Sequence, residues 1–325
     1  MTYFLLHAVA FAVARLPRRA AERFGVLLGV LAGSVLRIRR AIVEEAIVRA
    51  LGVDASAIAD RMYRDLGRGL VELLWLAGGG RERRKRAIDE VRIDDGAARA
   101  FDDAARRGPV VVFASHTGNW ELAAAAAARL LGRRGKRLFV VAKPMHARGV
   151  DRFLARLRRE AGVEAVAPRG ALSAARRALA AGDVVVTPID QVPDRAEHAV
   201  SLPFLGAPAL VDRAPATLAW RSRATVLVVA AERAGDGGHL VRVIDAIHPP
   251  APDERDARAW ILETTRRATA ALDRFVRSVP HGWLWLHRRW RAPRAAAASR
   301  EPHAQTLRVH RPVPSARLVA PRKAG

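Results

Sequence analysis

The sequence predicts an α/β fold with a largely parallel central sheet flanked by helices. Short apolar runs rich in valine, such as those at 110–113 and 183–190, alternate with helical segments of about ten residues. This alternation is typical of parallel strands whose connecting helices cover both faces of the sheet. The chain of 325 residues is 50% hydrophobic and 27% charged, so it can bury a sizeable core in one large or two modest domains.

The N-terminal part contains two apolar runs, residues 1–14 and 24–36, and each is followed by a group of arginines. Each run is shorter than the ~20 residues that a helix needs to cross a bilayer, and Pro17 and the arginines resist fusion into one span. No basic residues precede the first run, which disfavours a removable signal peptide. We expect a pair of interfacial helices with arginines that reach the headgroups, although two ordinary core helices would show the same pattern.

Residues 41–77 are expected to continue as packing helices with a break at Gly52. The glycines and the basic run at 78–86 predict a loop. A helix at 97–106 then leads into the strand at 110–113, which carries the first candidate site.

That strand is followed by polar residues and then by an alanine-rich helix, residues 121–131. Open α/β sheets place ligands at such joins, because the first backbone N–H groups of a helix lack partners. His116 and Glu121 lie in the join, and an imidazole can take a proton from a hydroxyl while a carboxylate within reach fixes its tautomer. Ser115 is expected to point to the opposite face of the sheet, so the pair suits a base that activates a hydroxyl of the substrate.

A purely structural interpretation fits the same residues. His116 would end a strand, and Glu121 would complement the helix dipole in the first helical turn. Thr117 or Asn119 would cap that helix. The spacing of His116 and Glu121 does not by itself choose between the two interpretations.

The second half of the chain continues the alternation of strands and helices. We expect strands at 137–143, 163–167 and 183–190, helices at 149–160, 171–180, 210–221 and 253–278, and a hairpin formed by 224–232 and 240–246. No Gly-x-Gly-x-x-Gly follows a strand, which disfavours nucleotide-driven chemistry.

These features divide the chain into three parts. Residues 1–95 are the N-terminal helical membrane-associating region, and residues 96–291 are the α/β domain. Residues 292–325 consist largely of Ala, Arg and Pro without periodicity, so they are expected to form a disordered basic tail.

The chain carries a formal net charge of +24 and no cysteine. The charge would attract nucleic acid, an anionic membrane or an acidic carrier protein, and it does not choose among them. The lack of cysteine excludes thiolate metal sites and a covalent acyl-cysteine intermediate.

The segment His116-Thr-Gly-Asn-Trp-Glu121 resembles the His-x-x-x-x-Asp/Glu motif of glycerolipid-type acyltransferases. It is most similar to the branch that contains the late acyltransferases of lipid A biosynthesis, the lauroyl and myristoyl transferases, and the acyltransferases of mannosylated phosphatidylinositol. The resemblance covers roughly residues 15–291. It implies a glycerolipid acyltransferase-like fold and the transfer of a fatty acyl group from a thioester to a hydroxyl on a membrane lipid. His116 would be the base and Glu121 its partner.

Three further segments resemble this family. Arg169 aligns with an arginine near the acceptor's phosphate or polar head, and a guanidinium can hold a phosphate with two hydrogen bonds. Asp190, followed by Gln191, resembles the Pro-Asp-His or Pro-Asp-Gln of the lipid A branch, and we expect Asp190 to help order Arg169. Residues 280–290, with tryptophans before His-Arg-Arg, resemble the closing signature of the family, although an aromatic cluster that seals the core is an alternative.

The sequence therefore predicts an acyltransferase at the cytoplasmic face of a bacterial inner membrane. A lipid A precursor is the expected acceptor, with a lysophospholipid or phosphatidylinositol mannoside as the alternative, and acyl carrier protein or acyl-CoA is the donor. Backbone N–H groups of the turn formed by Thr117, Gly118 and Asn119 are expected to stabilise the oxyanion.

We expect a monomer that uses no metal and no cofactor. The alternative function from another class is that of a basic nucleic-acid-binding protein. It would need a groove-reading helix or stacking aromatics on a sheet, and the sequence shows neither.

Overall fold

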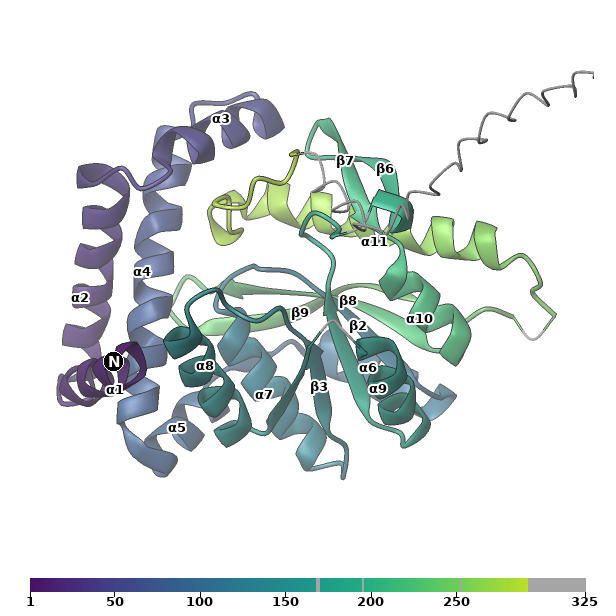
Figure 1. Cartoon of the computed structure of the whole chain (residues 1–325), viewed down its shortest axis with the longest axis horizontal. Helices are drawn as coiled ribbons and strands as arrows, with labels where there is room; N and C mark the ends of the chain where they lie inside the picture. Colours follow the sequence, from purple (N-terminus) through teal and green to yellow (C-terminus); the bar gives the residue numbers. More distant parts are fainter. Residues whose placement is uncertain (168–169, 195, 252, 292–325) are drawn as a thin grey trace, which may run out of the picture.

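The computed structural model describes residues 1–167, 170–194, 196–251 and 253–291. Within them, the central feature is a curled sheet of seven strands in the order β1-β9-β8-β2-β5-β3-β4 (Figure 1). Neighbouring strands are parallel except for β8 and β9, which form an antiparallel hairpin. The predicted mostly parallel α/β sheet is therefore confirmed. The strands are β1 (Arg92–Ile93), β2 (Val110–Ala114), β3 (Leu138–Val141), β4 (Val163–Val166), β5 (Val184–Pro188), β8 (Thr225–Arg233) and β9 (His239–Ile247).

Helices cover both faces of this sheet. On one face, Val111 and Phe113 of β2 pack into a core with residues of α9, α10 and α11. On the other face, Val110 packs with residues of α6 and α7. The helices of this part are α6 (Asp95–Arg107), α7 (Trp120–Gly132), α8 (Arg148–Glu160), α9 (Ala171–Ala180), α10 (Ala214–Ser222) and α11 (Ala257–Ser278).

The N-terminal helices stand at one side of the sheet (Figure 1). They are α1 (Thr2–Val13), α2 (Arg18–Val30) with a π-helical extension η1 (Leu31–Val35), α3 (Arg40–Leu51), α4 (Ser56–Gly78) and α5 (Gly80–Asp89). The first two expected helices are confirmed, and so is the break at Gly52, which takes φ +68° beyond the end of α3. None of the helices in the described ranges combines the length and hydropathy that crossing a bilayer requires.

Helices α2 and α4 lie side by side in close contact, which glycines make possible. A Cβ atom on Gly29 would lie 2.2 Å from the backbone oxygen of Tyr63, and one on Gly67 would lie 2.2 Å from the backbone oxygen of Gly25. Real Cβ atoms do not approach backbone oxygens so closely, so only glycine fits at these positions. The two backbones therefore touch, and α4 in turn packs against the α/β part.

Two sequence expectations about local structure were wrong. The predicted loop at 78–86 is instead α5, because its Arg, Lys and Glu residues are good helix formers and Arg84 is buried against Glu160 of α8. The predicted helix at 210–221 begins only at Ala214.

The first residues of the predicted helix at 210–221 belong instead to a two-stranded antiparallel hairpin. Its strands are β6 (Ala199–Phe204) and β7 (Ala207–Asp212). The hairpin turns at Leu205 and Gly206, whose φ angles of +49° and +79° suit a two-residue hairpin loop. The expected tail at 292–325 lies outside the described residues.

Candidate active site

The register of the sheet brings His116 and Asp190 together. β2 and β5 are parallel neighbours, and Ala114 at the end of β2 pairs with Pro188 at the end of β5. His116 and Asp190 each follow two residues later, so both side chains emerge at the same edge of the sheet. The carboxyl edge of a parallel sheet is where open α/β folds bind ligands.

Asp190 is buried and accepts three hydrogen bonds. Its Oδ1 accepts one from Nδ1 of His116 at 2.9 Å, and its Oδ2 accepts one from the backbone N–H of His116 at 2.8 Å. The indole N–H of Trp283 donates the third to Oδ2 at 3.0 Å. Because Nδ1 of His116 donates to a carboxylate, the lone pair of the neutral imidazole lies on Nε2. This is the atom that can take a proton.

In the pair of His116 and Asp190, the charge of each group stabilises the charged form of the other. Burial disfavours the charged form of His116, but the charge and hydrogen bond of Asp190, together with the charge of Glu121, raise its pKa above the ordinary value. Burial likewise opposes ionisation of Asp190, yet the His116 charge and the hydrogen bonds hold the pKa of Asp190 well below its usual range. Asp190 is therefore a carboxylate at neutral pH, and His116 is a stronger base than free imidazole.

The Nε2 side of His116 faces a small set of polar and aromatic groups. The side chain is 18% exposed, and the amide nitrogen of Gln191 lies 3.4 Å from its Nε2. The rings of Trp120 and His287 contact the imidazole edge-on, with centroids 5.1 and 5.0 Å away. These rings fix the orientation of the base while leaving part of it open.

His287 is a second histidine beside the base. Burial, together with the charges of His116, Arg289 and Arg39, outweighs the attraction of Asp190 and lowers its pKa to about 4. It is therefore uncharged at neutral pH. Its Nε2 is buried and has no hydrogen-bond partner among the described residues.

Glu121 lies in the first turn of α7, but its carboxylate binds an arginine. Nε of Arg158, on α8, donates to Oε2 of Glu121 at 2.9 Å, and Nη2 donates to the other oxygen. The hydrogen bond that we expected between Glu121 and His116 is thus made by Asp190 instead, and Glu121 acts on the imidazole through its charge. The reason is geometric, because Glu121 sits on the helix that faces α8.

The three turn residues predicted to bind substrate are held tightly by the fold. Thr117 is fully buried, and its hydroxyl accepts the backbone N–H of Ala231 at 3.0 Å. Gly118 takes φ +55°, and its N–H donates to the oxygen of Gly282 at 2.8 Å. Asn119 caps α7 by accepting the N–H of Leu122 at 3.3 Å.

Asn119 is in turn fixed by a buried carboxylate of α4. Glu72 accepts the side-chain N–H of Asn119 at 2.9 Å, a hydrogen bond from Arg233 at 2.7 Å, and contacts Nε2 of His239 at 3.2 Å. Burial opposes its charge, but these partners lower the pKa of Glu72 to about 2. The N-terminal helices thereby hold the turn that follows the base.

Ligand atoms of His116, Asp190 and His287 lie within 4.8 Å of one another, so among the described residues this group could hold a metal ion. Two of those atoms, Nδ1 of His116 and Oδ1 of Asp190, already share a hydrogen bond. In this arrangement the side chains of His116, Asp190 and His287 therefore suit proton transfer. Arg169, the predicted phosphate ligand, lies outside the described residues.

Sequence reasoning missed three residues that build this site. Trp283 and His287 were noticed only as part of the tryptophan-rich closing signature, and their contacts with Asp190 and His116 explain why that segment lies here. Glu72 lies in a stretch that resembles the family but was given no chemical role, because a single glutamate in an amphipathic helix is usually solvent-exposed.

Comparison with known proteins identifies the family of the chain. The family model described as bacterial lipid A biosynthesis acyltransferase matches residues 1–292. A search of curated proteins returned no match. The match spans the N-terminal helices, the sheet and the tryptophan-rich closing segment, and the chain therefore belongs to the bacterial lipid A biosynthesis acyltransferases and is an acyltransferase.

Proposed function

We propose that the protein transfers a fatty acyl group from an acyl thioester to a hydroxyl of a lipid A precursor, with His116 as general base. One observation carries the proposal: Nδ1 of His116 is bound to the buried carboxylate of Asp190, which leaves the lone pair on Nε2 of a side chain that is 18% exposed. The family supports an acyl thioester of acyl carrier protein as donor and a lipid as acceptor. Acyl-CoA remains the alternative donor.

In the reaction that follows, Nε2 of His116 removes the proton of the acceptor hydroxyl as its oxygen attacks the thioester carbonyl. The imidazolium is stabilised by Asp190, and the tetrahedral oxyanion then collapses with loss of the thiolate. The imidazolium returns its proton to that thiolate, which leaves as a thiol. The chain contains no cysteine, which excludes an acyl-cysteine intermediate, and the proposed step passes the acyl group directly from donor to acceptor.

We assign Glu121 a supporting role in this step. Its carboxylate is held by Arg158 rather than by the base, but its negative charge raises the pKa of His116. Glu121 would thus favour the imidazolium that forms in the transition state, as a second carboxylate behind Asp190.

The oxyanion needs donors besides the base. The N–H of Gly118 already donates to Gly282 and Thr117 is fully buried, so we assign this role to the backbone N–H of Asn119 and to the amide of Gln191. Gln191 lies beside Nε2 of His116, which places its amide next to the reacting atoms. Arg169 stays in the proposal as a ligand of the acceptor's polar head.

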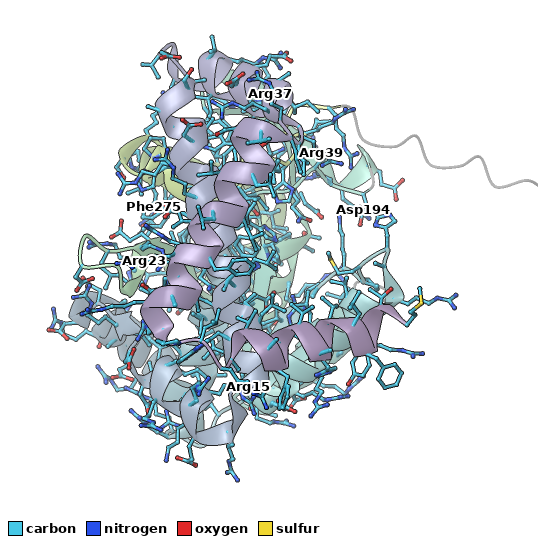
Figure 2. All side chains as sticks on the ribbon, turned by 90° about the vertical axis from the view of Figure 1, so that its left-hand side faces the viewer. Arg15, Arg23, Arg37, Arg39, Asp194 and Phe275 are labelled. Atoms are coloured by element: carbon cyan, nitrogen blue, oxygen red, sulfur yellow. The ribbon has the colours of Figure 1, made fainter. Side chains whose placement is uncertain are left out.

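We further propose that α1, α2 and η1 dock the enzyme on the cytoplasmic face of the inner membrane. Apolar side chains on these helices are strongly exposed, for example Phe4 at 76%, Leu27 at 65% and Val35 at 67%. Arginines flank this face, with Arg15 near α1 and Arg37 and Arg39 at the far end of α2 (Figure 2). Exposed apolar groups flanked by arginines are what an interfacial helix presents to anionic lipids.

A single substitution tests the mechanism. Purified His116→Ala should lose acyl transfer by about 10²-fold or more, because general base catalysis typically contributes 10²- to 10⁴-fold. It should still bind lipid vesicles, since the proposed membrane face is unchanged. The measurement is transfer of a radiolabelled acyl group from acyl carrier protein to a lipid A precursor, with vesicle flotation in parallel.

The matched control is His248→Ala, which removes an exposed histidine that contacts Arg107. It should keep normal transfer. Full transfer by His116→Ala would end the proposed mechanism.

A further inference from the structure

The loop between η1 and α3 has an unusual backbone conformation. Arg37 and Arg39 both take left-handed conformations, with φ of +50° and +56°. Residues other than glycine rarely adopt this region, and two arginines do so here within three positions. Such strained residues persist only where the surroundings hold them, and they gather at functional sites.

Buried contacts hold this loop in place. Arg40 is only 6% exposed, and its guanidinium donates to Glu44 at 2.7 Å and to Asp60. The hydroxyl of Tyr63 on α4 donates to the backbone oxygen of Ile38. The loop is therefore anchored on both sides of Arg39, so the direction in which Arg39 leaves the loop is fixed.

Arg39 reaches the segment that packs against the catalytic base. Its Nη1 lies 3.4 Å from the backbone oxygen of Leu286. The next residue, His287, stacks edge-on against His116 with ring centroids 5.0 Å apart. Arg39 also lies close enough to His287 for its charge to help lower the pKa of that histidine. A residue of the N-terminal helices thus stands at the rim of the catalytic site.

The guanidinium of Arg39 is exposed and available. Arg37 and Arg40 both contact Glu44, whereas Arg39 has no carboxylate partner among the described residues. Its neighbour Ile38 is 50% exposed, so the cation sits beside an apolar surface. A fixed guanidinium with free N–H groups, next to apolar side chains and near the base, matches a phosphate carried by an amphiphile.

We propose that Arg39 binds a phosphate group of a substrate and holds that substrate at the His116 site. The inference rests on the proposed function, since it assigns the ligand to that reaction. Two substrates could supply the phosphate: the polar head of an anionic lipid acceptor, or the phosphopantetheine of the thioester donor. Arginine rather than lysine fits the role, because its planar fork binds two phosphate oxygens at once.

The test uses variants that keep the loop conformation. Arg39→Asn removes the cation but tolerates the left-handed backbone, and Arg39→Lys keeps the charge without the fork. Arg258→Asn is the control, because it removes an exposed arginine at the start of α11, on the far side of the molecule from α3 (Figure 1).

Steady-state transfer should be measured with a phosphorylated glucosamine disaccharide lipid and with its dephosphorylated counterpart. For Arg39→Asn we expect the acceptor KM to rise about tenfold or more with little change in kcat, because a hydrogen bond to a charged group is lost. Arg39→Lys should recover part of that loss. On the dephosphorylated acceptor, the variant and the unaltered enzyme should have the same KM.

A rise confined to the KM of the donor would instead identify phosphopantetheine as the source of the phosphate. The proposal is overturned if Arg39→Asn behaves like Arg258→Asn, or if its acceptor KM rises as much on the dephosphorylated acceptor as on the phosphorylated one.

A binding experiment separates this inference from the proposed function. Flotation with neutral vesicles containing the phosphorylated disaccharide lipid requires no acyl transfer. If the unaltered protein binds these vesicles through Arg39 but transfers no acyl group, the reaction is wrong and the phosphate site stands. If the unaltered protein transfers normally, and Arg39→Asn binds these vesicles equally well and shows no rise in the KM of acceptor or donor, the phosphate site is wrong and the reaction stands.

Discussion

The buried charge of Asp190 is stabilised by hydrogen-bond donors, and it acts in turn on His116. A carboxylate removed from water is costly unless donors surround it, and Asp190 receives N–H groups from the backbone and ring of His116 and from Trp283. Its negative charge then raises the pKa of His116. One residue therefore sets the tautomer, the orientation and the basicity of the imidazole.

The pH dependence of acyl transfer should report this arrangement. A base acts only when it is neutral, so kcat should fall as pH drops through the pKa of His116. Because that pKa is raised, the acid limb should lie above about 6.5, the value of an unperturbed histidine. In Asp190→Asn the charge is lost and burial dominates, so the limb should move to lower pH while the plateau falls at least about tenfold.

Glu121→Gln provides the comparison for that experiment. It should move the limb in the same direction but by less, because Glu121 acts on His116 only through its charge. If the acid limb of the pH profile moves further in Glu121→Gln than in Asp190→Asn, the assignment of Asp190 as the partner of His116 is contradicted.

The sequence predicted that His116 lies at the edge of the sheet, but it did not predict that Asp190 binds it. A buried strand followed by a helix predicts the edge of the sheet where His116 lies. Asp190 follows His116 by 74 positions, and only the pairing of β2 with β5 brings them together. Arg158, which binds Glu121, is one of 56 lysines and arginines, and nothing in the sequence distinguishes it from the others as a partner of Glu121.

At the scale of elements, the contact between α2 and α4 depends on glycine. Gly29→Ala would place a methyl group 2.2 Å from the backbone oxygen of Tyr63, so the helices would have to move apart. Overpacking of this kind typically costs about 1–3 kcal/mol. We expect the free energy of unfolding, measured by urea denaturation, to fall by that amount.

Gly132→Ala is the control for this experiment. No atom lies within 4 Å of the Cβ that it would add at the end of α7. Its effect on stability should stay within about 0.5 kcal/mol, as for most surface substitutions. Equal stability of the two variants would show that α2 and α4 are not in contact in solution.

The elements that the sequence predicted well are those with a strong periodic pattern. The valine-rich strands of the parallel sheet and the helix at 171–180 were found within a few residues. The segment at 78–86 was mistaken for a loop because glycines and charges suggest one, although Arg84 is buried by its ion pair with Glu160. The short hairpin of β6 and β7 was missed because its pairing depends on tertiary contacts.

At the scale of the whole molecule, the net charge of +24 and the apolar face act together. Leu27, on α2 in the proposed membrane face, is 65% exposed. Leu27→Glu removes an apolar contact and adds a negative charge, so its affinity for anionic vesicles should fall about tenfold or more. Raising the salt concentration should weaken vesicle binding of the unaltered protein, because salt screens the arginines.

Leu262→Glu makes the same change at a leucine of α11 that is 42% exposed and belongs to another part of the surface. It should leave vesicle binding nearly unchanged, and flotation measures both variants. Equal losses in the two would mean that binding follows overall charge and has no preferred face.

The hydrogen bond from Asn119 to Glu72 has a practical consequence for anyone who shortens the chain. A soluble fragment that starts after α4 would lose the carboxylate that Arg233 and His239 also contact. Arg233 and His239 would then lose the carboxylate that binds them, and the turn that follows His116 would lose its hydrogen bond to α4. The leading helices thus support the candidate site, and removing them to ease purification should yield an inactive protein.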